Sequence, residues 1–304
     1  MEMIGRIADI ILPVFAIVGI GYAYGRLRGA AVTADMTTVN RVSMDILCPL
    51  LVFTALAAKD FDLAHNADLI IAGILISLGS GLLAWPVAKA LGYDVRSFVP
   101  PMMYNNCGNM GLPLAALAFG PTGLSAAVAL FMACNLVYFS AGVKILESGR
   151  SDTKTPFLQF MRSPMMLAML IGVGFSVLGI VIPQPLFHGM SMLGEACIPL
   201  MLFALGVRML EIEFHSWRIG LVGAVVCPVT GLIVAALLDQ GLALTEMQRG
   251  QMYLFASLPP AVFCFMMAER YRQEPDKVAS IVLLGNLAAF LFVPIGLWLG
   301  LPRG

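Results

Sequence analysis

Residues 100–113 read Pro-Pro-Met-Met-Tyr-Asn-Asn-Cys-Gly-Asn-Met-Gly-Leu-Pro, and they interrupt a chain that is otherwise one apolar segment after another. A helix in a bilayer tolerates such residues poorly, because a polar group without a hydrogen-bond partner in hydrocarbon costs several kcal/mol. Such a backbone survives at membrane depth only where it is buried in protein or lines a cavity. We therefore expect the other helices to hold this interruption, and the interruption to form the functional site.

The amino-acid composition is typical of an integral membrane protein. Of the 304 residues, 60% are hydrophobic and 12% are charged, whereas soluble domains carry about 25% charged residues. The net charge of zero disfavours nucleic acid as a partner. The six cysteines all fall in apolar segments without a CxxC pair, so we expect buried thiols and no metal site. The chain carries no enzyme motif, so we expect neither catalysis nor a cofactor.

Apolar windows of about 20 residues, the length that crosses a bilayer, follow one another along the chain. There are ten, at approximately 7–25, 37–58, 67–91, 97–118, 121–144, 164–182, 190–210, 217–238, 248–269 and 277–300. If all ten cross, fourteen of the eighteen Lys and Arg residues fall on one side of the membrane. Because cytoplasmic loops are enriched in Lys and Arg, this bias predicts that both termini face the outside, which is the periplasm in a bacterial inner membrane.

The chain also resembles itself after 150 residues. Asp45 is followed four residues later by Pro49, and Glu195 is followed four residues later by Pro199. A phenylalanine follows each proline at the same distance, without a gap. The two segments are therefore copies of one another.

The longest polar interval, 147–163, separates a first five-helix repeat at 1–146 from a second at 164–304. An odd number of helices in each repeat means that the two copies cross the membrane in opposite directions. Inverted repeats with interrupted helices in matching positions are typical of secondary transporters. The expected fold is therefore an all-α membrane protein with ten transmembrane helices and a short cytoplasmic linker.

The second copy of the interruption is Ala-Ser-Leu-Pro-Pro-Ala at 256–261. A proline has no N–H, so Pro113 and Pro260 each leave the carbonyl four residues earlier without its helical donor. The fourth and ninth helices should therefore break, and we expect their second halves to begin near one another. Their positive N-terminal ends would then point at one region.

Three asparagines and their neighbours are the candidate ligand contacts at this crossing. The full set of candidate substrate-binding residues is Asn105, Asn106, Asn109, Gly111, Pro113, Asn135, Ser257, Pro259 and Pro260. Amide groups both donate and accept, and no charged residue lies near either break. Such a site favours a ligand that brings a negative charge, such as a carboxylate. The alternatives are a capping role at a kink for the three asparagines near the break, and interhelical hydrogen bonding for Asn135.

Asp45, Glu195 and Asn286 are candidates for coupling to an ion or a proton. The two acids are the only ones well inside the predicted spans, and intramembrane carboxylates commonly serve proton relay or cation binding. Pro49 and Pro199 also free the carbonyls of these same acids. The alternative is that Asp45 pairs with Arg41, or that both acids lie near enough to the interface to be hydrated.

The runs at 105–113 and 256–261, together with Ala-Glu-Arg-Tyr at 268–271, resemble the motifs of the auxin efflux carrier family. That family includes the plant PIN carriers and bacterial malonate or malate permeases, and the resemblance extends over nearly the whole chain. It implies two inverted five-helix repeats whose broken helices cross, as in sodium/bile acid symporters and NhaA-type antiporters. The residues that it would place along the crossing are Asn105, Asn109, Pro113, Ser257 and Pro260.

The resemblance further implies a scaffold of helices 1, 2, 6 and 7 and a transport domain of helices 3–5 and 8–10. It also implies an elevator-type movement and a homodimer. We expect a secondary active transporter of small organic anions, either mono- or dicarboxylates. The sequence leaves open a coupling proton or sodium ion, a sodium-coupled symporter of larger amphipathic anions, and a membrane sensor that binds its ligand without transporting it.

Overall fold

The computed structural model describes residues 2–29, 31–58, 61–148, 161–210 and 216–301. Within these ranges the chain is helical, and an isolated β-bridge is the one extended pairing. The expected linker at 147–163 falls largely on 149–160, outside the described ranges.

The chain forms two compact units. Unit 1 consists of Met1–Ala67, Leu112–Val128 and Leu158–Glu211, and unit 2 consists of Asp68–Gly111, Ala129–Phe157 and Ile212–Gly304. Each unit therefore takes segments from both halves of the sequence, rather than one unit forming from each half.

Seven described helical segments are long and apolar enough to cross a membrane. They are Gly5–Arg28, Met36–Leu56, Ala67–Ala90, Thr122–Glu147, Gln184–Arg208, Trp217–Leu238 and Pro275–Gly300. Two shorter apolar helices are Cys107–Gly120 and Pro164–Leu178. The expected span at 248–269 is divided into two short helices. An all-helical chain with several membrane spans is thus confirmed, while the ten-helix inverted arrangement stays a prediction.

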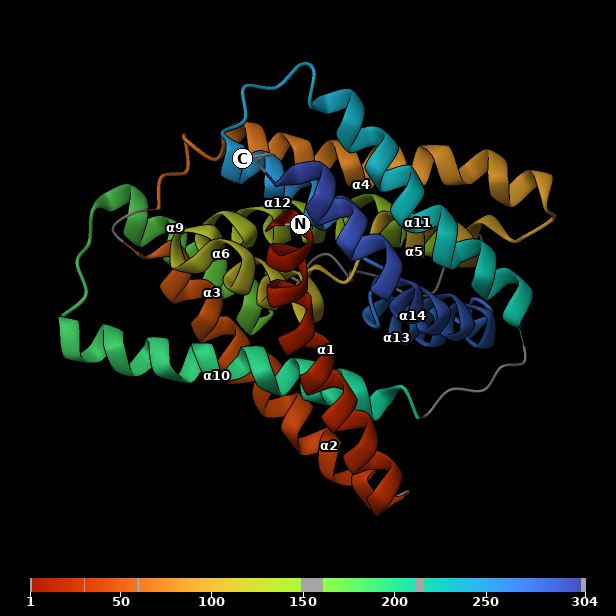
Figure 1. The fold of residues 1–304 in the computed structure, drawn as a ribbon, viewed down its shortest axis with the longest axis horizontal. Helices are drawn as coiled ribbons and strands as arrows, with labels where there is room; N and C mark the ends of the chain where they lie inside the picture. Colours follow the sequence, from red (N-terminus) through yellow and green to blue (C-terminus); the bar gives the residue numbers. More distant parts are fainter. Residues whose placement is uncertain (1, 30, 59–60, 149–160, 211–215, 302–304) are drawn as a thin grey trace. The chain divides into compact units, whose positions relative to one another are not determined.

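Unit 1 is held together by the close approach of two helices. Its described elements are α1 (Glu2–Arg28), α2 (Ala31–Val42), η1 (Ser43–Leu47), α3 (Cys48–Leu56), the first part of α6 (Leu112–Val137), α9 (Pro164–Leu178) and α10 (Gln184–Arg208). Figure 1 shows α1 lying beside α10. A Cβ atom added at Gly21 would lie 2.1 Å from the carbonyl oxygen of Phe203, and one at Gly206 would lie 2.0 Å from that of Val18. Only small residues allow two membrane helices to approach this closely.

The two acids proposed for coupling lie on the exposed side of unit 1. Asp45 lies in the π-helical turn η1, directly before the first turn of α3, where Pro49 is accommodated. The carboxylates of Asp45 and Glu195 are both exposed, and Glu195 accepts a hydrogen bond from Ser191 at 2.9 Å. Neither acid therefore lies in a buried ion site within unit 1, and a role for either in coupling stays a prediction.

Unit 2 contains both breaks, while the helix that follows the first break is grouped with unit 1 from Leu112 to Val128. The described elements of unit 2 are α4 (Ala67–Ala90), α5 (Val95–Met103), η2 (Cys107–Gly111), the end of α6, η3 (Tyr138–Gly142), α7 (Val143–Glu147), α11 (Trp217–Leu238), α12 (Glu246–Ala256), α13 (Phe263–Tyr271) and α14 (Pro275–Gly300). Helices α11 and α14 pack along one another, as Figure 1 shows. Buried side chains from α4, α5, α11 and α14 form the core, among them Ala84, Phe98, Met102, Cys227 and Ile281.

Local signals fix where the broken helices begin. Asp94 caps α5, because its carboxylate accepts the backbone N–H of Arg96 at 2.9 Å and also pairs with the Arg96 guanidinium at 2.9 Å. That ion pair lowers the pKa of Asp94. Thr245 and Gln248 form a capping box at the start of α12. Arg249, one residue later, pairs with Asp239 at 2.7 Å, which lowers the pKa of the Asp239 carboxyl.

Candidate functional site at the crossing of two broken helices

The two interruptions meet within unit 2 and satisfy part of one another's backbone. The segment 104–106 separates α5 from η2, and the segment 257–262 separates α12 from α13. The two segments pair antiparallel through a bridge between Asn105 and Pro260. The N–H of Asn106 donates to the carbonyl of Pro259 at 2.6 Å, and the N–H of Ala261 donates to that of Tyr104 at 2.9 Å. Each break therefore supplies hydrogen bonds that the other would lack in a membrane.

The proline argument places the second break correctly and the first one too late. The carbonyl of Ala256 has no hydrogen-bond partner in the part of the chain that the structure describes, because residues 259 and 260 are both prolines. In the first break, however, the interruption lies at 104–106, and Asn109 already belongs to the π-helical turn η2. Pro113 follows in the first turn of α6, where a proline loses no helical bond. Pro113 is grouped with unit 1, whereas both breaks belong to unit 2, so a contact of Pro113 with substrate stays a prediction.

Four helix ends meet at the crossing, and the antiparallel pairing alternates their signs. The start of η2 lies beside the end of α12, and the start of α13 lies beside the end of α5. A Cβ atom at Gly111 would come within 2.8 Å of Leu258, which shows how closely η2 packs on the second break. Each positive helix N-terminus therefore faces a negative C-terminus. The sign of a bound ligand must depend on which side of the crossing it occupies.

Asn106 and Asn286 form a buried amide pair. The Asn106 side chain donates to the Asn286 oxygen at 2.9 Å. Asn286, from α14, in turn donates to the carbonyl of Pro260 at 3.3 Å and to that of Val282 at 2.7 Å. The pair thus links both breaks to α14. Asn286 therefore lies at the crossing and holds the two breaks together.

Asn105 and Asn135 also use their amides within unit 2. The Asn105 nitrogen donates to the carbonyl of Phe255, and its oxygen accepts from the thiol of Cys134 at 3.8 Å. Asn135 accepts from the hydroxyl of Tyr104 at 2.8 Å and donates to the carbonyl of Phe131 at 2.7 Å. The geometry of Asn135 favours the alternative in which it joins segments rather than contacts a ligand.

Open hydrogen-bond donors remain at the two helix N-termini. Asn109 is half-buried, and neither its side-chain amide nor its backbone N–H has a partner among the described residues. The same holds for the backbone N–H of Phe263, the first residue of α13, within the described ranges. These groups are placed to receive an acceptor such as a carboxylate.

Ser257 is directed away from such a ligand. Its side chain is fully buried, and its hydroxyl donates to the carbonyl of Leu254 at 2.7 Å. A Cβ atom at Gly296 would lie only 2.2 Å from that hydroxyl oxygen, so Ser257 packs tightly on α14. Binding by Ser257 stays a prediction that this packing does not favour.

The sequence reasoning missed several residues that surround the crossing. Tyr104 stacks on Tyr138 with ring centroids 4.4 Å apart, and Phe263 meets Tyr104 edge-on at 6.2 Å. Ser77 and Ser80, from α4, also reach the first break. Two isolated serines in an apolar span give no signal of this kind, because such hydroxyls usually bond to their own helix.

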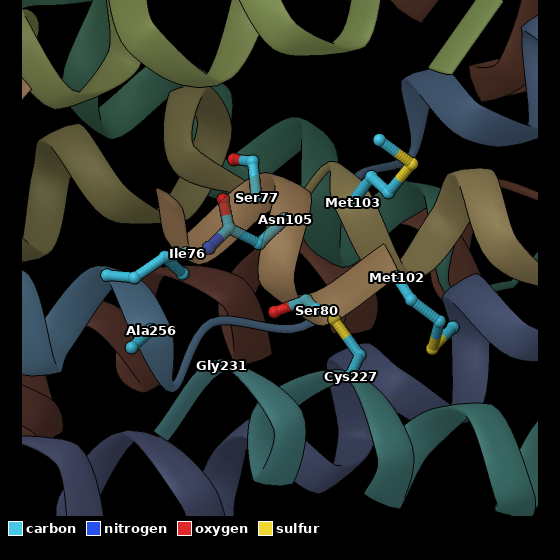
Figure 2. A pocket seen from close by; sticks show the side chains of 9 residues that line it. All are labelled: Ile76, Ser77, Ser80, Met102, Met103, Asn105, Cys227, Gly231 and Ala256. Carbon is cyan, nitrogen blue, oxygen red and sulfur yellow. The ribbon is translucent and has the colours of Figure 1, made fainter. Parts of the chain in front are cut away.

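A small cavity lies on one side of the crossing, as Figure 2 shows. Its lining consists of Ile76, Ser77, Ser80, Met102, Met103, Asn105, Cys227, Gly231 and Ala256. Its volume of about 10 Å³ is near the minimum that holds one water molecule. An organic anion therefore does not fit this cavity in the conformation described.

Comparison with known proteins identifies the relatives of the chain. The family described as "Membrane transport protein" matches residues 7–158 and 151–297. An "Uncharacterized transporter" of Methanothermobacter thermautotrophicus is 25% identical over 94% of this chain and 96% of its own. A "Putative malonate transporter" of Rhizobium meliloti is 23% identical over 93% of this chain and 92% of its own. A third transporter, from Methanocaldococcus jannaschii, is 18% identical over 96% of this chain and 98% of its own.

Proposed function

The chain belongs to the membrane transport protein family, and from this premise we propose that it is a secondary active transporter of small organic anions. The observation that carries the proposal is the open donors at the crossing, namely the amide of Asn109 and the N–H groups at the two helix N-termini. No charged side chain lies on 104–113 or 256–263 to compete for the ligand. A carboxylate would replace its water partners with these donors.

The substrate class follows from the same chemistry. Neutral amides and helix ends bind a carboxylate without the cost of burying a paired cation. The Rhizobium relative is named for malonate, which carries two carboxylates. We propose mono- and dicarboxylates as the substrates, with one carboxylate at Asn109.

The movement proposed is of the elevator type. In support, unit 2 contains both breaks and the complete amide pair, and unit 1 is a compact body that includes Leu112–Val128, the segment after the first break. Unit 2 would then carry the substrate, while unit 1 would serve as the scaffold and as the contact surface of a homodimer. The inner membrane of a bacterium and outward-facing termini complete the proposal.

Transport by purified protein in liposomes tests this function directly. We expect a panel of radiolabelled mono- and dicarboxylates to include at least one that the wild type takes up. Replacing Asn109 by Ala should lower that uptake by about tenfold, since one hydrogen bond to a charged group contributes roughly 1.5 kcal/mol or more.

Asn40→Ala is the matched control, because Asn40 is a half-buried asparagine in α2 of unit 1. Normal uptake by Asn109→Ala would remove Asn109 from the site. Failure of the wild type to move any carboxylate, combined with carboxylate-dependent thermal stabilisation, would instead identify a sensor.

A further inference from the structure

The cavity beside Asn105 offers oxygen atoms to a ligand and no cationic group. Its polar side chains are those of Ser77, Ser80 and Asn105, and its other lining residues are apolar or glycine. This is the opposite of the donor-rich surroundings of Asn109. The cavity therefore calls for a ligand of a different kind from an organic anion.

Hydrogen bonds fix which atom of Asn105 faces this region. The Asn105 nitrogen is held by the carbonyl of Phe255, so its oxygen points to the side of Cys134. Ser77 donates its proton to the sulfur of the same Cys134 at 3.6 Å, which leaves the lone pairs of the Ser77 oxygen available. Both side chains consequently present acceptors.

Ser80, a buried residue, adds a further hydroxyl to the lining of the cavity. Its side chain is 3% exposed, and among the described residues it has no hydrogen-bond partner. Serine and threonine in helices usually bond to the carbonyl four residues earlier, as Thr54 and Thr230 do here at 2.8 and 2.7 Å. Figure 2 shows the Ser80 hydroxyl directed instead into the space that Asn105 and Ala256 border.

Backbone groups at the cavity carry negative partial charge. Helix α5 ends at Met103 and α12 ends at Ala256, and both residues line the cavity. Helix C-termini are the negative ends of the helix dipole. The carbonyl of Ala256 is also the one that Pro260 leaves without a donor. Free carbonyls and half-helix C-termini are groups that coordinate small cations inside membrane transporters.

We infer that this cavity binds a single Na⁺ ion, with oxygen ligands from Ser77, Ser80, Asn105 and Ala256. A divalent cation would call for carboxylate ligands, and no acidic residue lines the cavity. The volume admits one particle of the size of a water molecule, which excludes a hydrated ion. The ion would join α4 to both broken helices and offset the negative ends of α5 and α12. Binding of Na⁺ to this cavity does not depend on the proposed transport function. Coupling of Na⁺ to the movement of an organic anion rests on that function.

Thermal unfolding of the full-length protein in lipid nanodiscs tests for the ion. At constant ionic strength, we expect Na⁺ to raise the unfolding midpoint in a saturable manner, and K⁺ and choline not to do so. Ser80→Ala should weaken the apparent Na⁺ affinity by about tenfold and leave the midpoint in choline nearly unchanged, because the Ser80 hydroxyl has no protein partner. The double variant Ser77→Ala/Ser80→Ala should abolish the response.

Ser280→Ala is the matched control, because Ser280 is a buried serine of unit 2 whose hydroxyl bonds to the carbonyl of Asp276 at 3.0 Å. It should keep the full Na⁺ response. An equal effect of all three salts, or a full Na⁺ response in the double variant, would overturn the inference and identify the occupant as an ordered water only.

Equilibrium binding of radioactive sodium provides a second readout that does not depend on unfolding. Carboxylate uptake measured on the same preparation separates the two proposals. Sodium binding without uptake of any carboxylate would contradict the transport function and support the cation site. Uptake at equal rates in Na⁺ and choline, without sodium binding, would support the transport function and contradict the cation site.

Discussion

At the level of single residues, the hydrogen-bonded amides of Asn106 and Asn286 hold the crossing together. Their amides connect the first break, the second break and α14 through hydrogen bonds of 2.7 to 3.3 Å. Both side chains are almost fully buried. In such surroundings every polar atom needs its partner, since an unpaired one costs about 1–3 kcal/mol.

Replacing Asn286 by Ala should therefore lower the stability of the protein by about 2–4 kcal/mol, because it leaves the Asn106 amide and the Pro260 carbonyl without their partner. The measurement is the thermal unfolding midpoint in nanodiscs, monitored by circular dichroism. Asn40→Ala again provides the control and should leave the midpoint close to that of the wild type. An Asn286→Ala protein as stable as this control would show that the amide pair does not hold the crossing.

Residue types alone identified the polar positions at the crossing but not the hydrogen-bond partners of each side chain. Asn105, Asn106 and Asn109 lie within five positions of one another, yet the first two bond to the protein and only Asn109 keeps its amide open. That difference arises from the residues opposite each one, Phe255 and Asn286, which lie far away in the sequence. Ser80 escaped notice because nothing in its sequence context shows that its hydroxyl leaves its own helix.

At the scale of helices, unit 1 depends on the contact between α1 and α10. Replacing Gly21 by Ala should destabilise the protein by about 1–3 kcal/mol, because the new methyl group would collide with the backbone of Phe203. The neighbouring Gly19 has open space around its Cα. Gly19→Ala should thus be neutral or slightly stabilising. Equal unfolding midpoints for the two variants would contradict the close packing of α1 on α10.

Periodicity and composition predicted the helices and the existence of both breaks, but not the position of the first. The proline rule assumes regular α-helix up to the proline, and the π-helical turn η2 violates that assumption. The turn η2 covers Cys107–Gly111 and includes Asn109, and Pro113 lies in the first turn of α6 directly after it, so no break occurs at Asn109. The second break follows the rule, because two successive prolines remove both donors that could reach Ala256.

For the whole molecule, the proposed elevator movement requires unit 2 to move as a rigid body. Gly79 in α4 and Val234 in α11 test this, because a Cβ atom at Gly79 would lie 3.6 Å from that of Val234, which suits a disulfide. In a background without the six native cysteines, Gly79→Cys/Val234→Cys should transport equally well when oxidised and when reduced. Single-cysteine variants serve as controls for the oxidant. A loss of flux on oxidation that reductant restores would show that unit 2 changes its internal shape.

The division into scaffold and transport domain came from family resemblance and not from the sequence pattern. The pattern revealed two halves in succession, whereas the structure groups helices from both halves in each unit. Such grouping depends on which apolar faces meet, and the apolar residues of this chain are spread too evenly to show it. The segment Leu112–Val128 illustrates the limit, because it follows the first break in the chain yet belongs with unit 1.

The bridge between Asn105 and Pro260 also constrains how the protein is made. The N–H of Asn106 finds its acceptor on Pro259, about 150 positions later in the chain. At usual rates of synthesis, that distance corresponds to about 10–30 s of translation. During this interval the first break has no partner, and hydrocarbon would penalise it. The first five helices should therefore stay near the translocon or a chaperone until the second half emerges, and a chain truncated after the linker should be a substrate for membrane proteases.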